Sequence, residues 1–443
     1  MTMARRQFVA MAAGAIAPAW LASGAGATPI ARRRPRVQRP VPSPGQLLWQ
    51  QDELALFIHF GVNTFTDREW GDGAESPSAF NPSAFDARQW ARTARAAGYR
   101  ALILTAKHHD GFCLWPTTTT AHSVASSPFR GGAGDVVREF TDACRAEGLR
   151  AGLYLSPWDR NAPSYGDSPR YDDFYCDQLT ELLTRYGPLH EIWFDGANGE
   201  GPNGRRQTYD WHRYWNLVRR HQPDAVMFSD AGPDIRWIGN ESGMAGDPNW
   251  STVDPTVVPF PGMSAQGIDM LLHGDPHGSV WRPGEADVSI RPGWFYHAAE
   301  DARVKTVDQL VDLYFASVGR NSKLLLNVPP ARTGLLHPTD VARLRGMRDR
   351  LDALFAEDQS VAVREGRDAA VSIADLREDI TRGQSVSRYE LSGRVGGEWR
   401  VLTRGTTIGH RKLDRFEPVT VSAVRLTIEA SVGDAGPVMV RLY

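Results

Sequence analysis

The chain has 443 residues, which is room for a barrel of about 250 residues and a further domain, so a small stapled scaffold is excluded. Its 50 Lys and Arg against 52 Asp and Glu give a net charge of −2, too balanced for the basic field that nucleic-acid binding needs, and we expect no nucleic-acid partner. Cys113, Cys144 and Cys176 show no paired spacing, so we expect free, mostly buried thiols.

The first 27 residues have the pattern of a signal peptide. Arg5 and Arg6 precede an apolar run from Phe8 to Leu21, and small residues follow up to Ala27. The paired arginines are similar to a bacterial twin-arginine signal, with an ordinary secretory signal as the alternative. We therefore expect an exported, periplasmic or secreted protein with a flexible leader over residues 28–44 and no membrane span.

Alternating strands and helices are predicted through the middle of the chain. Apolar runs predict strands at Ala55–Phe60, Arg100–Thr105, Arg150–Leu155, Glu191–Phe194, Ala225–Phe228, Trp294–Tyr296 and Lys323–Val328, with an eighth around Ile235–Ile238. Helical patterns lie between them, at Ser83–Gly98 with Ser83 as cap, Asp135–Gly148, Asp172–Tyr186, Tyr209–Arg220 and Thr306–Val318. Repeated strand–helix units predict a parallel sheet, and eight of them favour a closed (β/α)8 TIM barrel over residues 45–355.

The pattern changes after about Leu354. Residues 356–443 contain short alternating strands, such as Trp399–Leu402 and Val424–Ile428, separated by Gly, Asp and Arg turns. We predict a small antiparallel β-sandwich. Packing against the barrel is its favoured role, and sugar binding is the alternative.

Polar residues close several of the predicted barrel strands, where barrels of this kind place their functional groups. His59 closes the first strand, the pair His108 and His109 the second, and Asp195 the fourth, while Glu241 follows the strand near Ile235. Each has a structural alternative: a core histidine, an Asx turn before Gly196, or a surface carboxylate. Together with the Trp residues, they provide the carboxylates, polar groups and apolar faces that glycosidic-bond hydrolysis requires, without a metal or organic cofactor.

The adjacent histidines also allow a metal site. His59, His108, His109 and Asp110 could serve a metal-dependent hydrolase. Neighbouring residues on a strand point to opposite faces, however, so one metal ion would rarely use both His108 and His109. Hydrogen bonding to sugar hydroxyls is the favoured interpretation.

Seven strings resemble glycoside hydrolase family 29, the α-L-fucosidases, over about residues 45–355. They are FIHFGVNTF with EWG, TAKHHDGFCLW, GLYLSPWD, EIWFDGA, RWIGNESG, EADVSIRPGWFYH and LLLNVPP. The resemblance implies a retaining enzyme with a catalytic barrel followed by a β-sandwich, acting on a fucosylated glycan. The RWIGNE string is similar to the branch specific for α-1,3/4-linked fucose.

The resemblance also implies roles for individual residues. Asp195 matches the nucleophile and Glu241 the acid/base, with Glu285 as its competitor. The residues that match sugar contacts are His59, Glu69, Trp70, His108, His109, Tyr154, Trp193, Arg291 and Trp294. Aglycone contacts are expected between Trp250 and Gly284.

Two other functions stay open at this point. One is a broad or α-1,2-preferring fucosidase, or a relative that accepts galactose. The other is a carbohydrate-binding protein without turnover, which the two carboxylates disfavour. The sequence does not indicate an oligomeric state.

Overall fold

The computed structural model describes residues 39–443, except residues 264 and 266. The expected signal peptide over 1–27 and residues 28–38 of the leader lie outside the described residues. Helix α1 (Pro44–Asp52) is capped by Ser43 in a reciprocal capping box with Gln46. Pro44, placed at the end of the leader, is therefore the first residue of a helix. Within 39–443, leaving out residues 264 and 266, no helix is long and apolar enough to cross a membrane.

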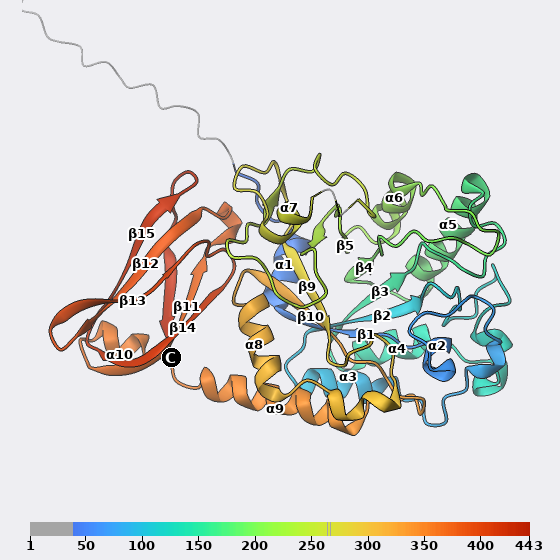
Figure 1. Cartoon of the computed structure of the whole chain (residues 1–443), viewed down its shortest axis with the longest axis horizontal. Helices are drawn as coiled ribbons and strands as arrows, with labels where there is room; N and C mark the ends of the chain where they lie inside the picture. Colours follow the sequence, from blue (N-terminus) through green and yellow to red (C-terminus); the bar gives the residue numbers. More distant parts are fainter. Residues whose placement is uncertain (1–38, 264, 266) are drawn as a thin grey trace, which may run out of the picture. The chain divides into compact units, whose positions relative to one another are not determined.

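Eight parallel strands close into a barrel in the order β1-β10-β9-β6-β5-β4-β3-β2 (Figure 1). Their bounds are β1 (Leu54–Ile58), β2 (Ala101–Lys107), β3 (Arg150–Leu155), β4 (Glu191–Trp193), β5 (Val226–Ser229), β6 (Ile235–Trp237), β9 (Gly284–Ser289) and β10 (Ser322–Asn327). Almost every strand residue is buried, as expected for a sheet covered on both faces. The predicted (β/α)8 barrel is confirmed.

One of the predicted strands is wrong. Trp294–Tyr296 contains no strand, and the barrel uses β9 in its place. Along β9 the polar Glu285 and Asp287 alternate with the apolar Ala286 and Val288, and all four are buried. Because carboxyl groups occupy interior positions, the strand lacks the continuous apolar run that identified the others.

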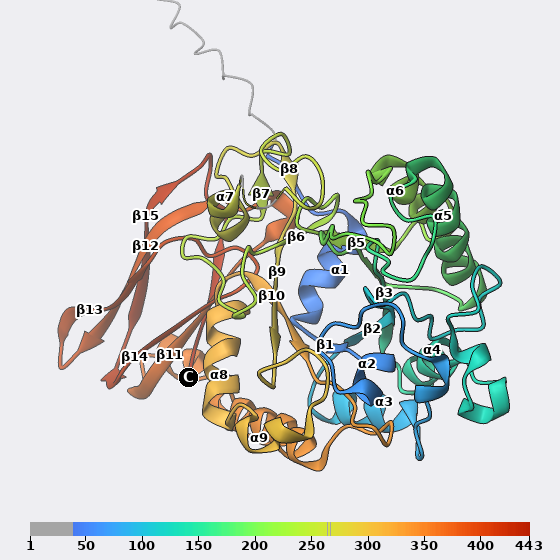
Figure 2. The ribbon, with the colours of Figure 1, turned by 45° about the vertical axis from the view of Figure 1, so that its right-hand side comes forward.

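Helices surround the barrel (Figure 2). The main ones are α3 (Ala87–Ala96), α4 (Val136–Ala146), α5 (Ser168–Arg185), α6 (Trp211–His221), α8 (Val307–Ser317) and α9 (Pro338–Leu354). Shorter elements are α2 (Val62–Thr66), α7 (Ile268–His273), α10 (Ser360–Arg364) and the two-stranded β7 (Thr252–Val253) and β8 (Val280–Trp281).

Side-chain caps set the helix starts. The helices expected from Asp135 and Thr306 begin directly after these residues, and each of the two side chains accepts a hydrogen bond from the third residue of its helix. The predicted cap Ser83 is wrong, since Asp86 accepts from Arg88 N and begins α3. Helix α5 begins before the expected Asp172, because a proline in its first turn favours the helical start there.

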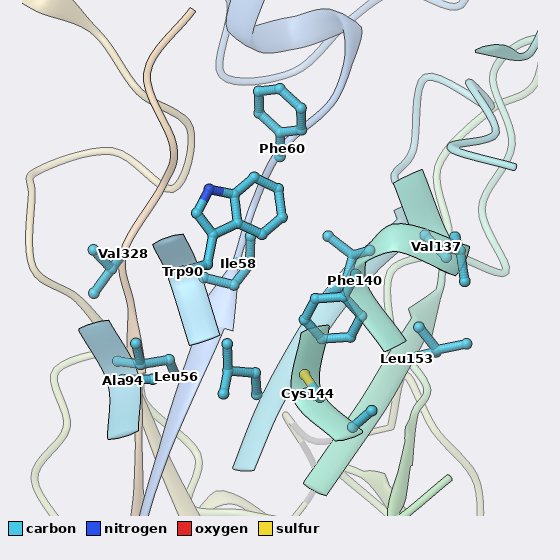
Figure 3. Packing of buried hydrophobic residues seen from close by; sticks show 14 of the residues in the cluster. Leu56, Ile58, Phe60, Trp90, Ala94, Val137, Phe140, Cys144, Leu153 and Val328 are labelled. Carbon is cyan, nitrogen blue, oxygen red and sulfur yellow. The ribbon is translucent and has the colours of Figure 1, made fainter. Parts of the chain in front are cut away.

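The outer core packs strand residues against helix residues. Trp90 of α3 and Phe140 of α4 lie among Ile58 and Leu153 of the strands (Figure 3). Trp90 is fully buried, and its Nε1 donates to Gly334 O at 3.0 Å. Filling this layer fixes the strands, and therefore the residues that follow their carboxyl ends. The three cysteines are free and buried, as expected.

The C-terminal region contains two three-stranded antiparallel sheets, which confirms the predicted β-sandwich. One has the order β14 (Lys412–Val421), β11 (Ala369–Glu378), β16 (Val438–Leu442). The other has the order β13 (Glu398–Gly405), β12 (Val386–Val395), β15 (Val424–Ser431). Val371, Tyr389, Leu391 and Val421 belong to the apolar cluster that joins strands of both sheets.

Ion pairs hold the sandwich against the amino ends of the barrel strands. Arg411 Nη1 lies 2.6 Å from Glu53 Oε2, just before β1, and its Nη2 lies 2.8 Å from Asp375 Oδ2 on β11. Lys412 Nζ pairs with Asp247. These ion pairs support packing as a role of the sandwich.

Candidate active site

A cavity of about 330 Å³ lies at the carboxyl ends of the barrel strands. Nine residues predicted from the sequence line it: His59, Trp70, His108, His109, Tyr154, Trp193, Asp195, Glu241 and Trp294. A larger cavity of about 1010 Å³ beside α9 has a single carboxylate, Asp67, in its lining. Only the smaller cavity therefore offers the pair of carboxyl groups that glycosidic-bond hydrolysis needs.

Asp195 lies just beyond β4 with one oxygen bonded to the backbone and the other to a tyrosine. Its Oδ1 accepts from Ala197 N at 2.7 Å, which is the Asx-type turn considered from the sequence. Its Oδ2 accepts from Tyr154 Oη at 3.0 Å and lies 3.9 Å from His109 Nε2. The turn and the functional role are thus compatible. Two donors stabilise and orient the carboxylate at the cavity wall.

Glu241 lies at the rim, on the loop after β6. The residue is exposed, so a leaving group and water can reach its carboxyl, and Trp294 Nε1 donates to Oε2 at 3.4 Å. Burial of part of the group and the negative charges of Asp195 and Glu69 raise the pKa of Glu241, against the opposing hydrogen bond from Trp294. A raised pKa is what a carboxylic acid needs in order to carry a proton near neutral pH.

The cavity histidines are neutral and present acceptor nitrogens. Asn327 donates through its amide nitrogen to Ser289 Oγ and Trp294 O, so its Oδ1 accepts from His59 Nδ1 at 2.8 Å. Burial lowers the pKa of His59 to about 3. The lone pair of its Nε2 is therefore available for hydrogen bonding.

The same reasoning applies to His109. Ser156 Oγ donates to Trp158 O and accepts from His109 Nδ1 at 2.7 Å, which leaves Nε2 as the acceptor. Burial lowers the pKa of His109, although the charge of Asp195 opposes the shift. Burial also lowers the pKa of His108 well below its ordinary value, and its Nδ1 has no hydrogen-bond partner in the described chain.

His108 and His109 both line the cavity, so the expectation that adjacent histidines would face apart is wrong. Strand β2 ends at Lys107, and the two rings follow it with centroids 4.1 Å apart. Strict alternation applies only within the strand. In residues 39–443, apart from 264 and 266, no group of three His, Cys, Asp or Glu side chains is placed to hold a metal ion.

Glu69 does not belong to the lining of the cavity, and its partly exposed side chain supports the loop that carries Trp294. Its carboxylate accepts from Trp294 N, from Phe295 N at 3.2 Å and from His297 Nε2 at 3.1 Å. These bonds fix the loop that carries Trp294. Trp70, the neighbour of Glu69, is 58% exposed at the rim and lies edge-on to Trp158.

The structure does not place Arg291 or Glu285 at the cavity, so two predicted roles are corrected. Arg291 is buried and bonded to Asp340 at 2.9 and 3.0 Å and to Asp301 at 2.8 Å, which leaves it no access to a sugar. Glu285 is fully buried deeper in the barrel, on β9 before Asp287, where its Oε1 accepts from Trp193 Nε1 at 3.0 Å. A group that neither water nor a leaving oxygen reaches cannot serve as the acid/base.

Sequence reasoning gave no role to six residues of the cavity lining. They are Phe57, Gly196, Ala197, Phe228, Asp230 and Asp287, while the remaining two, Trp237 and Gly262, lie in the RWIGNE string and in the loop expected at the aglycone side. Asp230 follows β5 as Asp195 follows β4, so the strand-end rule could have found it. Its oxygens accept from Gly262 N at 2.9 and 3.2 Å, and burial together with the Asp195 charge raises its pKa to about 6. Gly262 belongs to the long 250–284 loop expected at the aglycone side.

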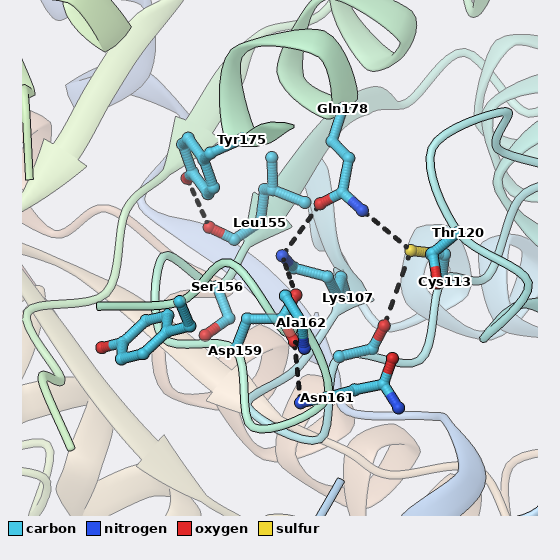
Figure 4. A network of polar contacts seen from close by, with 12 residues as sticks. Lys107, Cys113, Thr120, Leu155, Ser156, Asp159, Asn161, Ala162, Tyr175 and Gln178 are labelled. Atoms are coloured by element: carbon cyan, nitrogen blue, oxygen red, sulfur yellow. Dashed lines mark hydrogen bonds and ion pairs between the residues drawn. The ribbon is translucent and has the colours of Figure 1, made fainter. Parts of the chain in front are cut away.

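A buried ion pair anchors the loops around the histidines (Figure 4). Lys107 Nζ lies 2.9 Å from Asp159 Oδ2 and donates to Gln178 Oε1 at 2.9 Å. Asp159 Oδ1 accepts from the backbone nitrogens of Asn161 and Ala162. This network joins the end of β2 to the loop after β3, and so fixes His109 relative to Tyr154.

Comparison with known proteins agrees with this geometry. The family model described as Alpha-L-fucosidase matches residues 66–353. The chain is 41% identical to alpha-L-fucosidase 1 of Arabidopsis thaliana, across 89% of this chain and 86% of that protein.

Two solved structures are similar over most of the chain. The first is a glycoside hydrolase 29 family member from an unknown rumen bacterium, with a TM-score of 0.84 and 40% identity, covering 91% of this chain and 77% of that one. The second is a Ruminococcus gnavus GH29 fucosidase in complex with fucose, with a TM-score of 0.82 and 31% identity, covering 91% and 95%.

Proposed function

Because the chain belongs to glycoside hydrolase family 29 and is an α-L-fucosidase, we propose that it is a retaining exo-glycosidase that releases α-L-fucose from α-1,3/4-fucosylated, Lewis-type glycans. The observation that carries the mechanism is the contrast between its two accessible carboxyl groups. Asp195 is bonded by two donors as a carboxylate, whereas the surroundings of Glu241 favour its acid form.

In the first step Asp195 attacks the anomeric carbon of the fucose residue. The bond from that carbon to the glycosidic oxygen breaks, a bond to the Asp195 carboxylate forms, and Glu241 gives its proton to the departing oxygen. In the second step Glu241, now ionised, takes a proton from water. The water oxygen bonds to the anomeric carbon and the Asp195 carboxylate departs, so two inversions give net retention.

The remaining side chains fit the binding of a deoxy sugar. His59 and His109 offer acceptor nitrogens to hydroxyl groups. Trp193, stacked on Phe228 at a centroid distance of 4.0 Å, and the half-buried Trp294 supply apolar faces for the ring and its methyl group. Exclusion of water around these groups strengthens each polar contact.

The α-1,3/4 preference is supported by the RWIGNE string, whose glutamate, Glu241, lines the cavity. A broad or α-1,2-preferring fucosidase is the alternative. The test compares fucose release from a branched Lewis-type trisaccharide and from 2′-fucosyllactose, with Asp195→Asn as the blank. Release from the branched sugar alone supports the preference. Equal release refutes it, and binding without release from either sugar favours a carbohydrate-binding relative.

We also propose that residues 1–27 are a signal peptide of the twin-arginine type, followed by a leader over 28–44, a barrel domain over 45–355 and a sandwich domain over 356–443. The paired Arg5 and Arg6 before an apolar run support the signal. Expression with Arg5→Lys and Arg6→Lys together should block export into a bacterial periplasm. Unchanged export would refute the twin-arginine route, and a mature protein that starts at Met1 would refute the signal.

A further inference from the structure

The lining of the cavity contains more carboxyl groups than positively charged side chains. Four carboxyl groups line it, from Asp195, Asp230, Glu241 and Asp287, while no lysine or arginine belongs to its described lining. Like charges close together in a poorly solvated site cannot all ionise at small cost. Glu241, the proposed acid, holds one proton, and the crowding favours the neutral form for a further carboxyl group of the cavity as well.

The hydrogen bonds single out Asp287. Asp195 accepts from two donors, and both oxygens of Asp230 accept from Gly262 N. Asp287 is 3% exposed and has one bond from another residue, in which Trp237 Nε1 donates to its Oδ1 at 2.8 Å. Its Oδ2 has no hydrogen bond to another residue of the described chain. A buried carboxyl with so little support for its charge favours the neutral form.

The groups that face Asp287 add to this preference. Glu241 approaches from the loop after β6, Asp195 from the end of β4, and Glu285 lies two residues back on β9 itself. On the β10 side, Leu325 is its partner in the strand register and carries no charge. Burial, followed by the charges of Glu241 and Asp195, raises the pKa of Asp287 well above its ordinary value.

Most hydrogen-bond donors of the cavity lining are already used. His59 and His109 present acceptors, while Tyr154 Oη, Trp294 Nε1 and Trp237 Nε1 donate to carboxyl groups. The donors left for a sugar are the one N–H of the neutral His108 ring and the indole N–H of Trp70 at the rim. A sugar hydroxyl can donate to these acceptors, but its own oxygen also needs a donor when water is excluded.

We propose that Asp287 is a sugar-binding residue that works as a neutral acid: its Oδ1 accepts from Trp237, and its Oδ2–H donates to a hydroxyl oxygen of the bound sugar. This assignment rests on the proposed fucosidase function, because it names a role toward the substrate of that reaction. It also explains why a carboxyl group occurs beside the catalytic pair without competing for the proton of Glu241.

The decisive test is the pH profile of Asp287→Asn. Asparagine retains an acceptor for Trp237 and a donor for the sugar, so kcat/KM on an aryl α-L-fucoside should fall only about three- to tenfold. The alkaline limb, which reports Glu241, should keep its position. If Asp287 were ionised, its replacement by a neutral group would lower the pKa of Glu241 and move that limb to lower pH by about one unit or more. Such a shift would overturn the proposal.

Asp287→Leu supplies the contrast, because leucine has a similar size and no donor. Its kcat/KM should fall about tenfold or more below that of Asp287→Asn, and equal losses in both variants would refute donation. Difference infrared spectra of parent and Asp287→Asn provide a readout independent of turnover. The difference spectrum should contain one carbonyl band of a protonated carboxylic acid that is present in the parent and lost in the variant, and a difference spectrum without such a band would refute the neutral form. If the parent fails to hydrolyse any fucoside, the proposed function fails, while the infrared result still reports the protonation of Asp287.

Discussion

The hydrogen bond from Tyr154 to Asp195 gives a sharp kinetic prediction. It joins Tyr154 Oη to Asp195 Oδ2 at 3.0 Å, and the tyrosine is buried against Trp193, so Tyr154→Phe removes the hydroxyl with little change in packing. A hydrogen bond to a charged group contributes about 1.5 to 3 kcal/mol, equivalent to about 10- to 150-fold in rate if all of it acts on one step.

Loss of the Tyr154 hydroxyl should slow mainly the second step, in which water releases the sugar from Asp195. Asp195 loses its charge when it attacks and regains it when it departs. A donor that stabilises the carboxylate therefore favours departure and opposes attack. With an activated aryl fucoside, we expect Tyr154→Phe to lower kcat at least tenfold and to give a burst of aryl alcohol equal to the enzyme concentration, because the covalent intermediate accumulates.

Rapid-mixing absorbance of the aryl alcohol provides the assay. The matched control is Tyr186→Phe, since Tyr186 Oη donates to Asp135 Oδ2 at the same distance, 3.0 Å, but on the outer helices. Tyr186→Phe should lower the stability of the protein but give no burst of aryl alcohol. An unchanged kcat for Tyr154→Phe, or a loss confined to the first step, would refute this account of the nucleophile.

The other predictions concern the acid/base and two buried ion pairs. Because the pKa of Glu241 is raised, its acid form persists to higher pH, and kcat/KM should fall as the pH rises through that pKa; Glu241→Gln should lose this limb. Lys107→Met should lower the free energy of unfolding by about 3 to 5 kcal/mol in urea titrations, since Asp159 is left as a buried unpaired charge. Arg411→Ala should cost about 1 to 3 kcal/mol at pH 7, because Arg411 is one of the cations that hold the pKa of Glu53 at about 2 despite burial.

The loss of stability in Arg411→Ala should depend on pH in a defined direction. A carboxyl group whose pKa is lowered by folding stabilises the protein above its ordinary pKa, and this stabilisation disappears as the pH falls toward 2. The difference in the free energy of unfolding between parent and Arg411→Ala should therefore become smaller in acid. A difference that stays constant with pH would contradict the argument. Arg415→Ala, which breaks an exposed pair with Asp312, should cost no more than about 1 kcal/mol.

The sequence predicted the barrel well because six of its strands contain near-continuous apolar runs and a seventh was recognised around Ile235, and strand-end polar residues then identified His59, His108, His109, Asp195 and Glu241. It failed where polar residues are interior. Strand β9 places Glu285 and Asp287 inside the barrel, so neither the strand nor the position of Asp287 in the cavity was found.

Other errors arise from contacts between distant residues, which no local pattern contains. Arg291 lies in a string that resembles the family, but its position is set by Asp301 and Asp340. Glu69 accepts from the backbone of Trp294 and Phe295, a role that no local pattern indicated, and its contact with a sugar stays a prediction. A string can therefore identify a family while leaving open which of its residues reach the substrate.

The central claim is that Asp195 forms a covalent bond to the sugar. Incubation with a 2-fluorinated fucosyl fluoride should trap this intermediate, because the fluorine at C2 slows both steps while the good fluoride leaving group speeds only the first. Peptide mass spectrometry should then find one added deoxyfluorofucosyl group, on Asp195. A label on another residue, or turnover with inversion of the anomeric centre and no label, would contradict the mechanism.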